Sequence, residues 1–267
     1  MAYIILDKDY LQGEKAETIF DLCKEHVLLI TWALFYELMT TAPKEREKCF
    51  KHLPDNCNIL IIHNVEYLRG YELENQKACT PIHAHALKGN LKFNKGLREG
   101  TFKFTKEQIN GIKLHEKQLK ERTENMLDRA MQLPTIISCE EGTLTNKKIE
   151  DIKQDIATDS ERVLEFYRWL IENDNTQKHI IKPEQLNSNW LEFRWVQINI
   201  IYALDLLLRY RGNIPSNSTK KFWQKIEHDL LDMEYVILGS LTGALASKEK
   251  RVREMFKLVC PNGLLIP

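Results

Sequence analysis

The sequence has no net charge, because 38 lysine and arginine residues balance 38 aspartate and glutamate residues over 267 positions. This excludes a protein that binds nucleic acid or an anionic membrane through its overall charge, so any such affinity must come from a local patch. Internal repeats and low-complexity tracts are also missing, and the chain therefore shows no sign of a repeat protein. With 43% hydrophobic residues, it can bury a sizeable core.

Segments for export or membrane insertion are not visible in the sequence. Residues 1–7 lack the positive start and the long apolar run that an export signal requires. The most apolar stretch, residues 196–210, is interrupted by polar and charged residues and predicts a buried helix rather than a membrane span. We therefore expect a cytoplasmic protein without membrane contact.

The six cysteines are scattered and form no C-x-x-C pair. In a large charged chain, this spacing is typical of a reduced, cytoplasmic protein. Cys79, His83 and His85 lie close together in "ACTPIHAH", but a zinc site usually needs a second pair of ligands, which the sequence lacks. A polar loop around Pro81 is the favoured interpretation, and a metal site is the alternative.

The first 65 residues alternate between strand and helix signals. "AYIILD" predicts a buried strand that ends at Asp7, and "VLLI" is apolar again. Residues 14–24 have helical spacing, and Thr31 can cap the helix that follows. Pro43 ends that helix or opens another that runs to about Leu53, before "NILIIH" forms a second clear strand. This order predicts an α/β fold with a parallel sheet.

The middle of the chain has a different character. Residues 64–186 contain few strand signals and include long charged, helix-prone stretches. They predict a helix-rich insertion or elaboration within one domain that spans residues 1–267. Residues 187–210 place aromatic and apolar side chains at helical spacing, and we expect this helix to pack the insertion on the sheet.

The last fifty residues return to the α/β pattern. Residues 219–238 predict a helix, and "GALAS" predicts a short strand of small residues. "KEKRVREMFK" predicts an amphipathic helix, and "LVC" predicts a last strand that Pro261 closes.

Four acids stand where ligands usually bind in such a sheet, namely Asp7, Glu37, Asp232 and Glu249. Asp7 closes the first strand and Glu249 follows "GALAS", while Glu37 and Asp232 lie in apolar helical segments. Carboxylates gathered at one end of a sheet repel one another and persist when a divalent cation neutralises them. Oxygen ligands suit Mg²⁺ or Mn²⁺, which can activate water and stabilise charge on a phosphodiester being cleaved.

Each acid also has a simpler explanation. Asp7 could be a turn residue, Glu37 an exposed helix residue, and Asp232 a first-turn acid favoured by the helix dipole. Glu249 could form an ion pair with a neighbouring lysine or arginine. Asp229, one helical turn before Asp232, is an alternative or additional third acid. Asp9 and Glu234 are candidates for a supporting role.

Three segments resemble motifs of PIN-like domain nucleases. Residues 3–13, "YIILDKDYLQG", resemble the apolar strand and Asp that open such domains. Residues 28–41, "LLITWALFYELMTT", resemble the second motif, in which Ser or Thr precedes a helix with an essential Glu. Residues 229–261 resemble the third and fourth motifs, in which an Asp opens a helix and Ser or Thr after a strand precedes another acid. That last acid is usually Asp, and Glu249 stands in its place.

The resemblance implies a three-layer α/β/α nuclease with a parallel central sheet. It implies that the four acids, with Asp229 as a further candidate, hold one or two Mg²⁺ or Mn²⁺ ions. RNA, mainly single-stranded, is the favoured substrate over DNA, and the protein could be a toxin or defence effector. The resemblance also implies a possible homodimer, and the unusual insertion indicates a specialised role with a regulatory protein partner. The alternatives are an inactive PIN-like scaffold that binds nucleic acid or protein, and a purely helical interaction protein, which a structure without a parallel sheet would favour.

Two basic segments are candidates for gripping a substrate. Residues 88–106 combine basic side chains with phenylalanines, which suits contact with phosphates and stacking on unpaired bases. Residues 248–253 lie beside the proposed acids. The alternatives are a solvated loop whose phenylalanines dock on the protein, and an exposed helix face. The candidate substrate-binding residues are Lys88, Lys92, Lys95, Arg98, Lys103, Lys248, Lys250 and Arg251.

Overall fold

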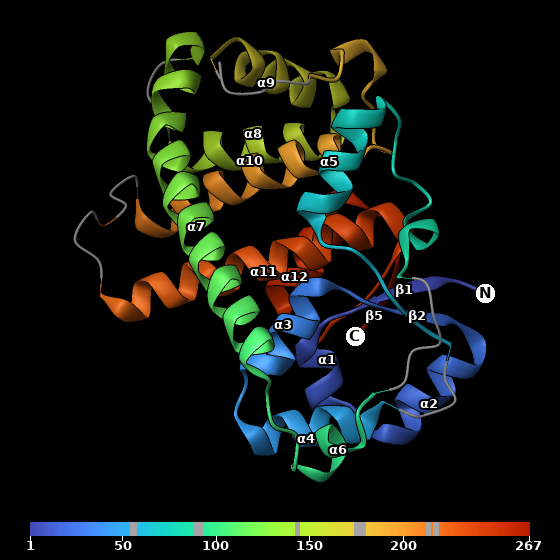
Figure 1. Cartoon of the computed structure of the whole chain (residues 1–267). Helices are drawn as coiled ribbons and strands as arrows, with labels where there is room; N and C mark the ends of the chain where they lie inside the picture. Colours follow the sequence, from blue (N-terminus) through green and yellow to red (C-terminus); the bar gives the residue numbers. More distant parts are fainter. Residues whose placement is uncertain (54–57, 88–92, 142–144, 174–179, 212–214, 216–218) are drawn as a thin grey trace.

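The computed structural model describes the whole chain except residues 54–57, 88–92, 142–144, 174–179, 212–214 and 216–218. It is mostly helical and contains one five-stranded sheet (Figure 1). The described part includes no helix that is both long and apolar enough to cross a membrane.

All five strands of the sheet run parallel, in the order β3-β2-β1-β4-β5. In the central strand β1, Ile5 stands opposite both Leu29 of β2 and Leu245 of β4. The prediction of an α/β fold with a parallel sheet is confirmed, and the purely helical alternative is wrong. The strands are β1 (Tyr3–Leu6), β2 (Val27–Ile30), β3 (Ile59–Ile61), β4 (Ala244–Ala246) and β5 (Leu264–Ile266).

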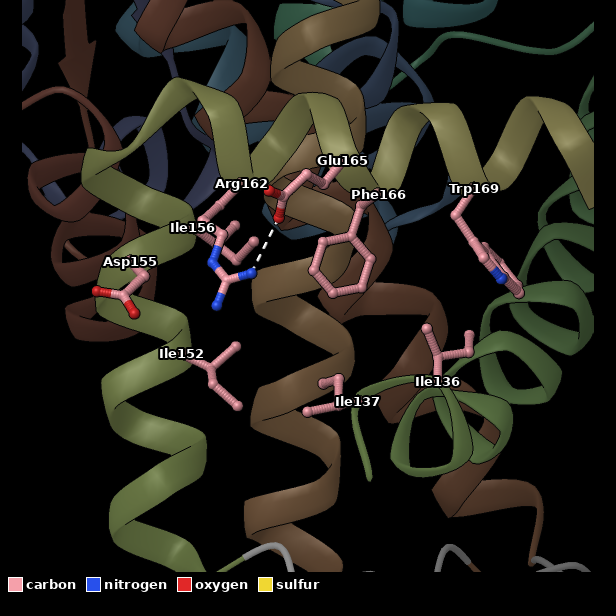
Figure 2. A pocket seen from close by; sticks show the side chains of 9 residues that line it. All are labelled: Ile136, Ile137, Ile152, Asp155, Ile156, Arg162, Glu165, Phe166 and Trp169. Atoms are coloured by element: carbon pink, nitrogen blue, oxygen red, sulfur yellow. Dashed lines mark hydrogen bonds and ion pairs between the residues drawn. The ribbon is translucent and has the colours of Figure 1, made fainter. Parts of the chain in front are cut away.

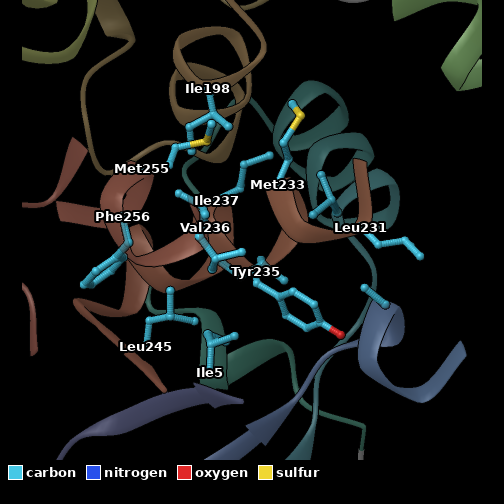
Figure 3. Close-up of a cluster of buried hydrophobic side chains, with 14 of the residues drawn as sticks. Ile5, Ile198, Leu231, Met233, Tyr235, Val236, Ile237, Leu245, Met255 and Phe256 are labelled. Carbon is cyan, nitrogen blue, oxygen red and sulfur yellow. The ribbon is translucent and has the colours of Figure 1, made fainter. Parts of the chain in front are cut away.

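Helices lie on both sides of the sheet, an arrangement compatible with α/β/α layers. Figure 1 shows α11 and α12 on one side, with α2 and α4 on the other. On the first side, Tyr235 and Val236 of α11 join Ile5, Leu245 and Phe256 in a buried apolar cluster (Figure 3). These helices are α1 (Lys8–Gly13), α2 (Ala16–Glu25), α3 (Trp32–Thr40), α4 (Pro43–His52), α11 (Lys220–Thr242) and α12 (Lys250–Val259).

The middle of the chain forms a helical body around α10 (Leu191–Tyr210). This helix packs against α5, α7, α8, α9 and α11, and α11 in turn contacts β1 and β4. The helical body therefore reaches the sheet through α10 and α11. Its other elements are α5 (Val65–Asn75), η1 (Ile82–His85), α7 (Lys106–Glu141), α8 (Asn146–Thr158), α9 (Ser160–Asn173) and η2 (Pro183–Gln185). The short helix α6 (Lys95–Glu99) packs against α4 instead.

The last strand differs from the sequence prediction. "LVC", expected to be a strand, continues α12 to Val259, and the strand is instead β5, after Pro261. The helix continues because Met255, Phe256 and Val259 extend its buried stripe at helical spacing. A side chain at Gly263 would meet Phe256 and Cys260, so glycine lets the chain turn closely back into β5.

The cysteines and the loop around Pro81 are partly as expected. Cys49, Cys79 and Cys260 are free thiols, but Cys23 is disulfide-bonded, against the expectation of reduced cysteines. In the loop, His83 stacks on Tyr3 with ring centroids 3.8 Å apart. His83 therefore packs against an aromatic ring, as expected for the loop interpretation.

Glu72 of α5 anchors the start of α10. Its buried carboxylate accepts backbone N–H groups of Leu191 (2.9 Å), Glu192 (2.8 Å) and Cys79 (2.8 Å). The capping residue of α10, Trp190, offers no side-chain hydrogen bond, so Glu72 satisfies the free N–H groups from a distant part of the chain. Hydrogen bonds to a charged group contribute more than neutral ones.

We expect Glu72→Ala to lower the free energy of unfolding by about 3 kcal/mol or more, because three buried N–H groups lose their acceptor. Glu72→Gln should cost less, since its one oxygen can still accept. Chemical denaturation measures both effects. Exposed Glu74 on the same helix supplies the matched control, and equal effects of Glu72→Ala and Glu74→Ala would contradict the anchoring role.

Candidate functional site

Asp7 lies at the carboxyl end of β1 and is 2% exposed. It caps α1, where its carboxylate accepts the backbone N–H of Asp9 at 3.2 Å. Its second oxygen accepts a hydrogen bond from the hydroxyl of Ser247, which follows the neighbouring strand β4. The two ends of the chain therefore meet at this edge of the sheet.

Glu37 reaches the same region from α3, which follows β2. Thr31 starts this helix as predicted, because its hydroxyl accepts the N–H of Leu34 at 3.0 Å. The Glu37 side chain is buried, so the alternative of an exposed helix residue is wrong. One carboxylate oxygen accepts the Tyr235 hydroxyl at 2.5 Å, and the other lies 3.5 Å from the Lys8 ammonium.

Asp232 lies in the interior of α11, which begins at Lys220. It is therefore neither a first-turn acid nor an acid that opens a helix, as the resemblance implied. Within the described part of the chain, its carboxyl group has no hydrogen-bond donor or ion-pair partner. Burial raises its pKa well above the usual range, and the negative charges of Glu249, Asp7, Glu37 and Asp229 raise it further.

Glu249 stands at the cap of α12, directly after β4. Its backbone N–H donates to the Ser247 hydroxyl at 3.1 Å, which places it beside the hydroxyl that binds Asp7. Burial raises the pKa of Glu249, and Asp9 and Asp229 raise it further, while Arg251 lowers it. Lys248 instead bonds to Glu14, at 3.1 Å.

These four acids share a region of excess negative charge. Burial, with a further contribution from the charge of Glu37, raises the pKa of Asp7 to about 7, although the Ser247 hydrogen bond opposes the shift. The mutual effects on Asp7, Asp232 and Glu249 indicate that the fold brings the four side chains into electrostatic range. A bound cation would relieve this repulsion.

The carboxylates are not arranged as a finished metal site. Among the described residues, no three histidine, cysteine, aspartate or glutamate side chains are grouped so that they could hold a metal ion together. Two of the acids are instead held by hydroxyl groups, Asp7 by Ser247 and Glu37 by Tyr235. Carboxylate oxygens are donors that Mg²⁺ and Mn²⁺ accept, but in the described structure these side chains do not surround a common ion position.

Asp229 has a different environment, although it lies one turn from Asp232. One of its oxygens accepts the Tyr202 hydroxyl at 2.9 Å and lies 2.7 Å from Arg209, while the other lies 2.7 Å from Arg251. The carboxylate thus ties α10, α11 and α12 together. Its two arginines supply the opposite charge that Asp232 lacks.

The two acids considered for a supporting role, Asp9 and Glu234, lie in different environments. Asp9 is exposed, whereas Glu234 is 2% exposed and lies 2.7 Å from Arg122 of α7. Arg122 also lies 2.6 Å from Glu66 of α5. Glu234 therefore belongs to a joint between α5, α7 and α11.

The first basic segment is only partly described. Lys88 and Lys92 lie outside the described residues. Arg98 donates to the backbone carbonyls of Phe50 and Leu53, and this fastens α6 to α4. Phe93, Phe102 and Phe104 are partly buried against the core, as in the docked-loop alternative. Lys95, which is paired with Glu99 at 3.2 Å, and Lys103 remain exposed.

The second basic segment is largely engaged within the protein. Lys248 donates to the Gly13 carbonyl at 3.1 Å, and Lys250 lies 3.6 Å from Glu254. Arg251 is bonded to Asp229, so its guanidinium serves the fold.

The sequence interpretation missed two features of this region. The first is a pair of hydrogen bonds from hydroxyl groups, from Tyr235 to Glu37 and from Ser247 to Asp7. The last motif includes Ser247 as its hydroxyl residue, but it did not predict the bond to Asp7. The second is a cleft of about 860 Å³, which Glu37 and Lys8 line together with lysines of α7 and α11. The spacing of Lys113, Lys117 and Lys120 along a polar helix was a signal for the cleft.

A separate hollow between α7, α8 and α9 has a different lining. Ile137, Ile152 and Phe166 make it largely apolar, and its Arg162 and Glu165 form an ion pair at 2.9 Å (Figure 2). Its volume is about 90 Å³. The acidic region beside the larger cleft is therefore the candidate site.

Comparison with protein-family models, curated proteins and solved structures found no match to this chain. The assignment of a function therefore depends on the residues themselves.

We expect Asp7→Asn to stabilise the protein above neutral pH when EDTA removes divalent cations. The folded state favours the protonated carboxyl, whose pKa is about 7, so the parent loses stability as the pH rises through that value. Thermal unfolding should give similar midpoints for the parent and the variant at pH 4.5. At pH 8 the variant should have the higher midpoint, with a free energy of unfolding larger by on the order of 3 kcal/mol. A constant difference across this range would contradict the raised pKa.

Asp229→Asn and Asp232→Asn should change stability in opposite directions in EDTA at pH 8. Asp229→Asn weakens two arginine ion pairs and should cost about 2 kcal/mol. Asp232→Asn removes a charge that has no partner in the described structure and should raise the unfolding midpoint. Denaturant titration of both variants measures the signs, and a loss of stability in both would mean that Asp232 has a stabilising partner.

Proposed function

We propose that this protein is a metal-dependent nuclease that hydrolyses phosphodiester bonds, with single-stranded RNA as the favoured substrate. The observation that carries the proposal is that Asp7, Glu37, Asp232 and Glu249 come within electrostatic range of one another near the carboxyl edge of the parallel sheet. Each comes from a different element, and burial with like charge raises the pKa of Asp7, Asp232 and Glu249. Strongly perturbed carboxyl groups that cluster in this way are typical of functional sites.

The fold supports a PIN-like domain. Asp7 follows the central strand β1, and Glu37 lies on the helix that follows β2, as the resembling segments require. Ser247 precedes Glu249 directly after β4, which matches the hydroxyl residue and acid of the last motif. The helices on both sides of the sheet are compatible with an α/β/α arrangement.

The four carboxylates would hold one or two Mg²⁺ or Mn²⁺ ions. When bound, such ions activate water and stabilise the charge that develops on the phosphate. Ser247 and Tyr235 orient Asp7 and Glu37 by hydrogen bonds. Because the pKa of Asp7 is about 7, cation binding would also release protons near neutral pH.

An inactive scaffold that binds nucleic acid is the second candidate. It is favoured by the fact that no three potential ligands among the described residues are grouped for a metal ion. In this case the acids would remain held by hydroxyl groups, and the protein would bind a strand without cutting it.

We expect cleavage of labelled single-stranded RNA in Mn²⁺, with Asp7→Asn and Asp232→Asn each slowing it about a hundredfold or more. Exposed Asp151 supplies the control, and Asp151→Asn should keep the parent rate. Labelled single-stranded DNA in a parallel assay identifies the preferred sugar.

Thermal unfolding adds a readout that is independent of cleavage. Mn²⁺ should raise the unfolding midpoint of the parent and leave that of Asp7→Asn nearly unchanged, because binding to the folded state alone stabilises it. Equal cleavage by the parent and Asp7→Asn would remove the proposed mechanism. Strand binding without cleavage or metal stabilisation would favour the scaffold.

A further inference from the structure

The cleft beside the acidic site is bounded by α3, α7 and α11. Figure 1 shows α7 running past α11 toward α3. Glu37 and Lys8 line the cleft, as do Tyr36 and Leu231, so the cleft reaches one of the four acids, Glu37. A volume of about 860 Å³ lies in the range of sites that enclose small ligands, and is far too small for a double helix.

Lysines line more than one wall of this cleft. Lys113, Lys117 and Lys120 stand at helical spacing on one face of α7, while Lys8 comes from α1 and Lys220 from α11. Lys113 and Lys117 are separated by ~6 Å along the helix axis, which is comparable to one nucleotide step in an extended strand.

The α7 lysines are available to an anionic ligand. Among the described residues, Lys117 and Lys120 form only exposed ion pairs on their own helix, at 3.7 Å with Glu121 and 4.0 Å with Glu124. Such pairs contribute little, so a phosphate can replace them. Lys113 has no ion-pair partner among the described residues.

Acids are also present, so the cleft is not uniformly basic. Glu116 of α7 and Glu227 of α11 line it, together with Glu37. Five lysines and three glutamates therefore line the cleft. This mixture favours an extended ligand whose phosphates lie beside the lysines over a compact, highly charged anion that would also contact the glutamates. Tyr36 adds an aromatic ring to the wall, and bases of an unpaired strand can stack on such rings.

We propose that this cleft binds an unpaired nucleic-acid strand, with Lys113, Lys117 and Lys120 contacting phosphates and Lys8 leading the strand to Glu37. The proposal rests on the proposed function for the fate of the strand, whereas binding itself is measured without cleavage. It assigns the grip on the substrate to the long helix α7, in addition to the exposed lysines of residues 95–103.

The test is fluorescence anisotropy in EDTA with labelled single-stranded RNA, single-stranded DNA and their duplexes. The triple variant Lys113→Gln, Lys117→Gln and Lys120→Gln is compared with a control of equal charge change, Lys24→Gln, Lys51→Gln and Lys77→Gln, at exposed positions outside the cleft. We expect the α7 variant to bind single strands at least about tenfold more weakly. The loss of three phosphate contacts should also reduce the slope of log affinity against log salt concentration by about 2. Thermal unfolding of each variant checks that it is folded.

Equal affinities of the α7 variant and the control would overturn the proposal, as would duplex binding as tight as that of single strands. The RNA and DNA arms identify which strand is preferred. Parent binding that depends on α7, without cleavage in Mn²⁺, would remove the nuclease function and leave the cleft assignment standing. If the parent cleaves RNA but the α7 variant binds strands as tightly as the parent, the nuclease function stands and the cleft assignment fails.

Discussion

The parallel pairing of β1 with β4 is the interaction on which the candidate site depends. It joins residues from the two ends of the chain, with Ile5 opposite Leu245 and Leu6 opposite Ala246. The backbone N–H of Asp7 continues this ladder to the carbonyl of Ala246 at 3.0 Å, and Ser247 then reaches the Asp7 side chain. Because the strands are parallel, their carboxyl ends coincide, and the acids after them must lie together. The long helical body between them contacts this part of the fold through α11 and α12.

Buried carboxylates in this protein are compensated in distinct ways. Glu72 receives three backbone N–H groups, Asp229 two arginines and a tyrosine, and Glu234 one arginine. Asp232, which is only half-buried, receives none of these within the described structure, and its neighbours add negative charge. Burying a charge without a partner is costly, so folds rarely retain such a group for packing alone. The contrast separates carboxylates that serve the fold from those available for chemistry.

Much of the α/β frame could be predicted from local signals. Thr31 caps its helix and the apolar run before Asp7 forms a strand, because both depend on neighbouring residues only. The prediction of a strand at "LVC" was wrong because a short apolar run fits both a strand and the last turn of a helix. Burial of the helix against the core favoured the helix. Asp229 and Asp232 could not be separated by sequence, since their difference arises from Arg209 and Arg251, which approach from other helices. The hydrogen bonds of Tyr235 and Ser247 were missed for a similar reason, because their partners, Glu37 and Asp7, lie in distant parts of the sequence.

The ion pairs of Arg122 have a consequence for distances within the molecule. Arg122 lies two residues beyond Lys120 and joins α7 to Glu66 of α5 and to buried Glu234 of α11. Sliding α7 by one turn would strand the Glu234 charge in the interior, so the helix is locked in register. The backbone of α7 is therefore held at a set position relative to α11, the helix that carries Asp232. A ligand bound by the α7 lysines, as proposed, would meet the carboxylates at an offset that this ion pair sets.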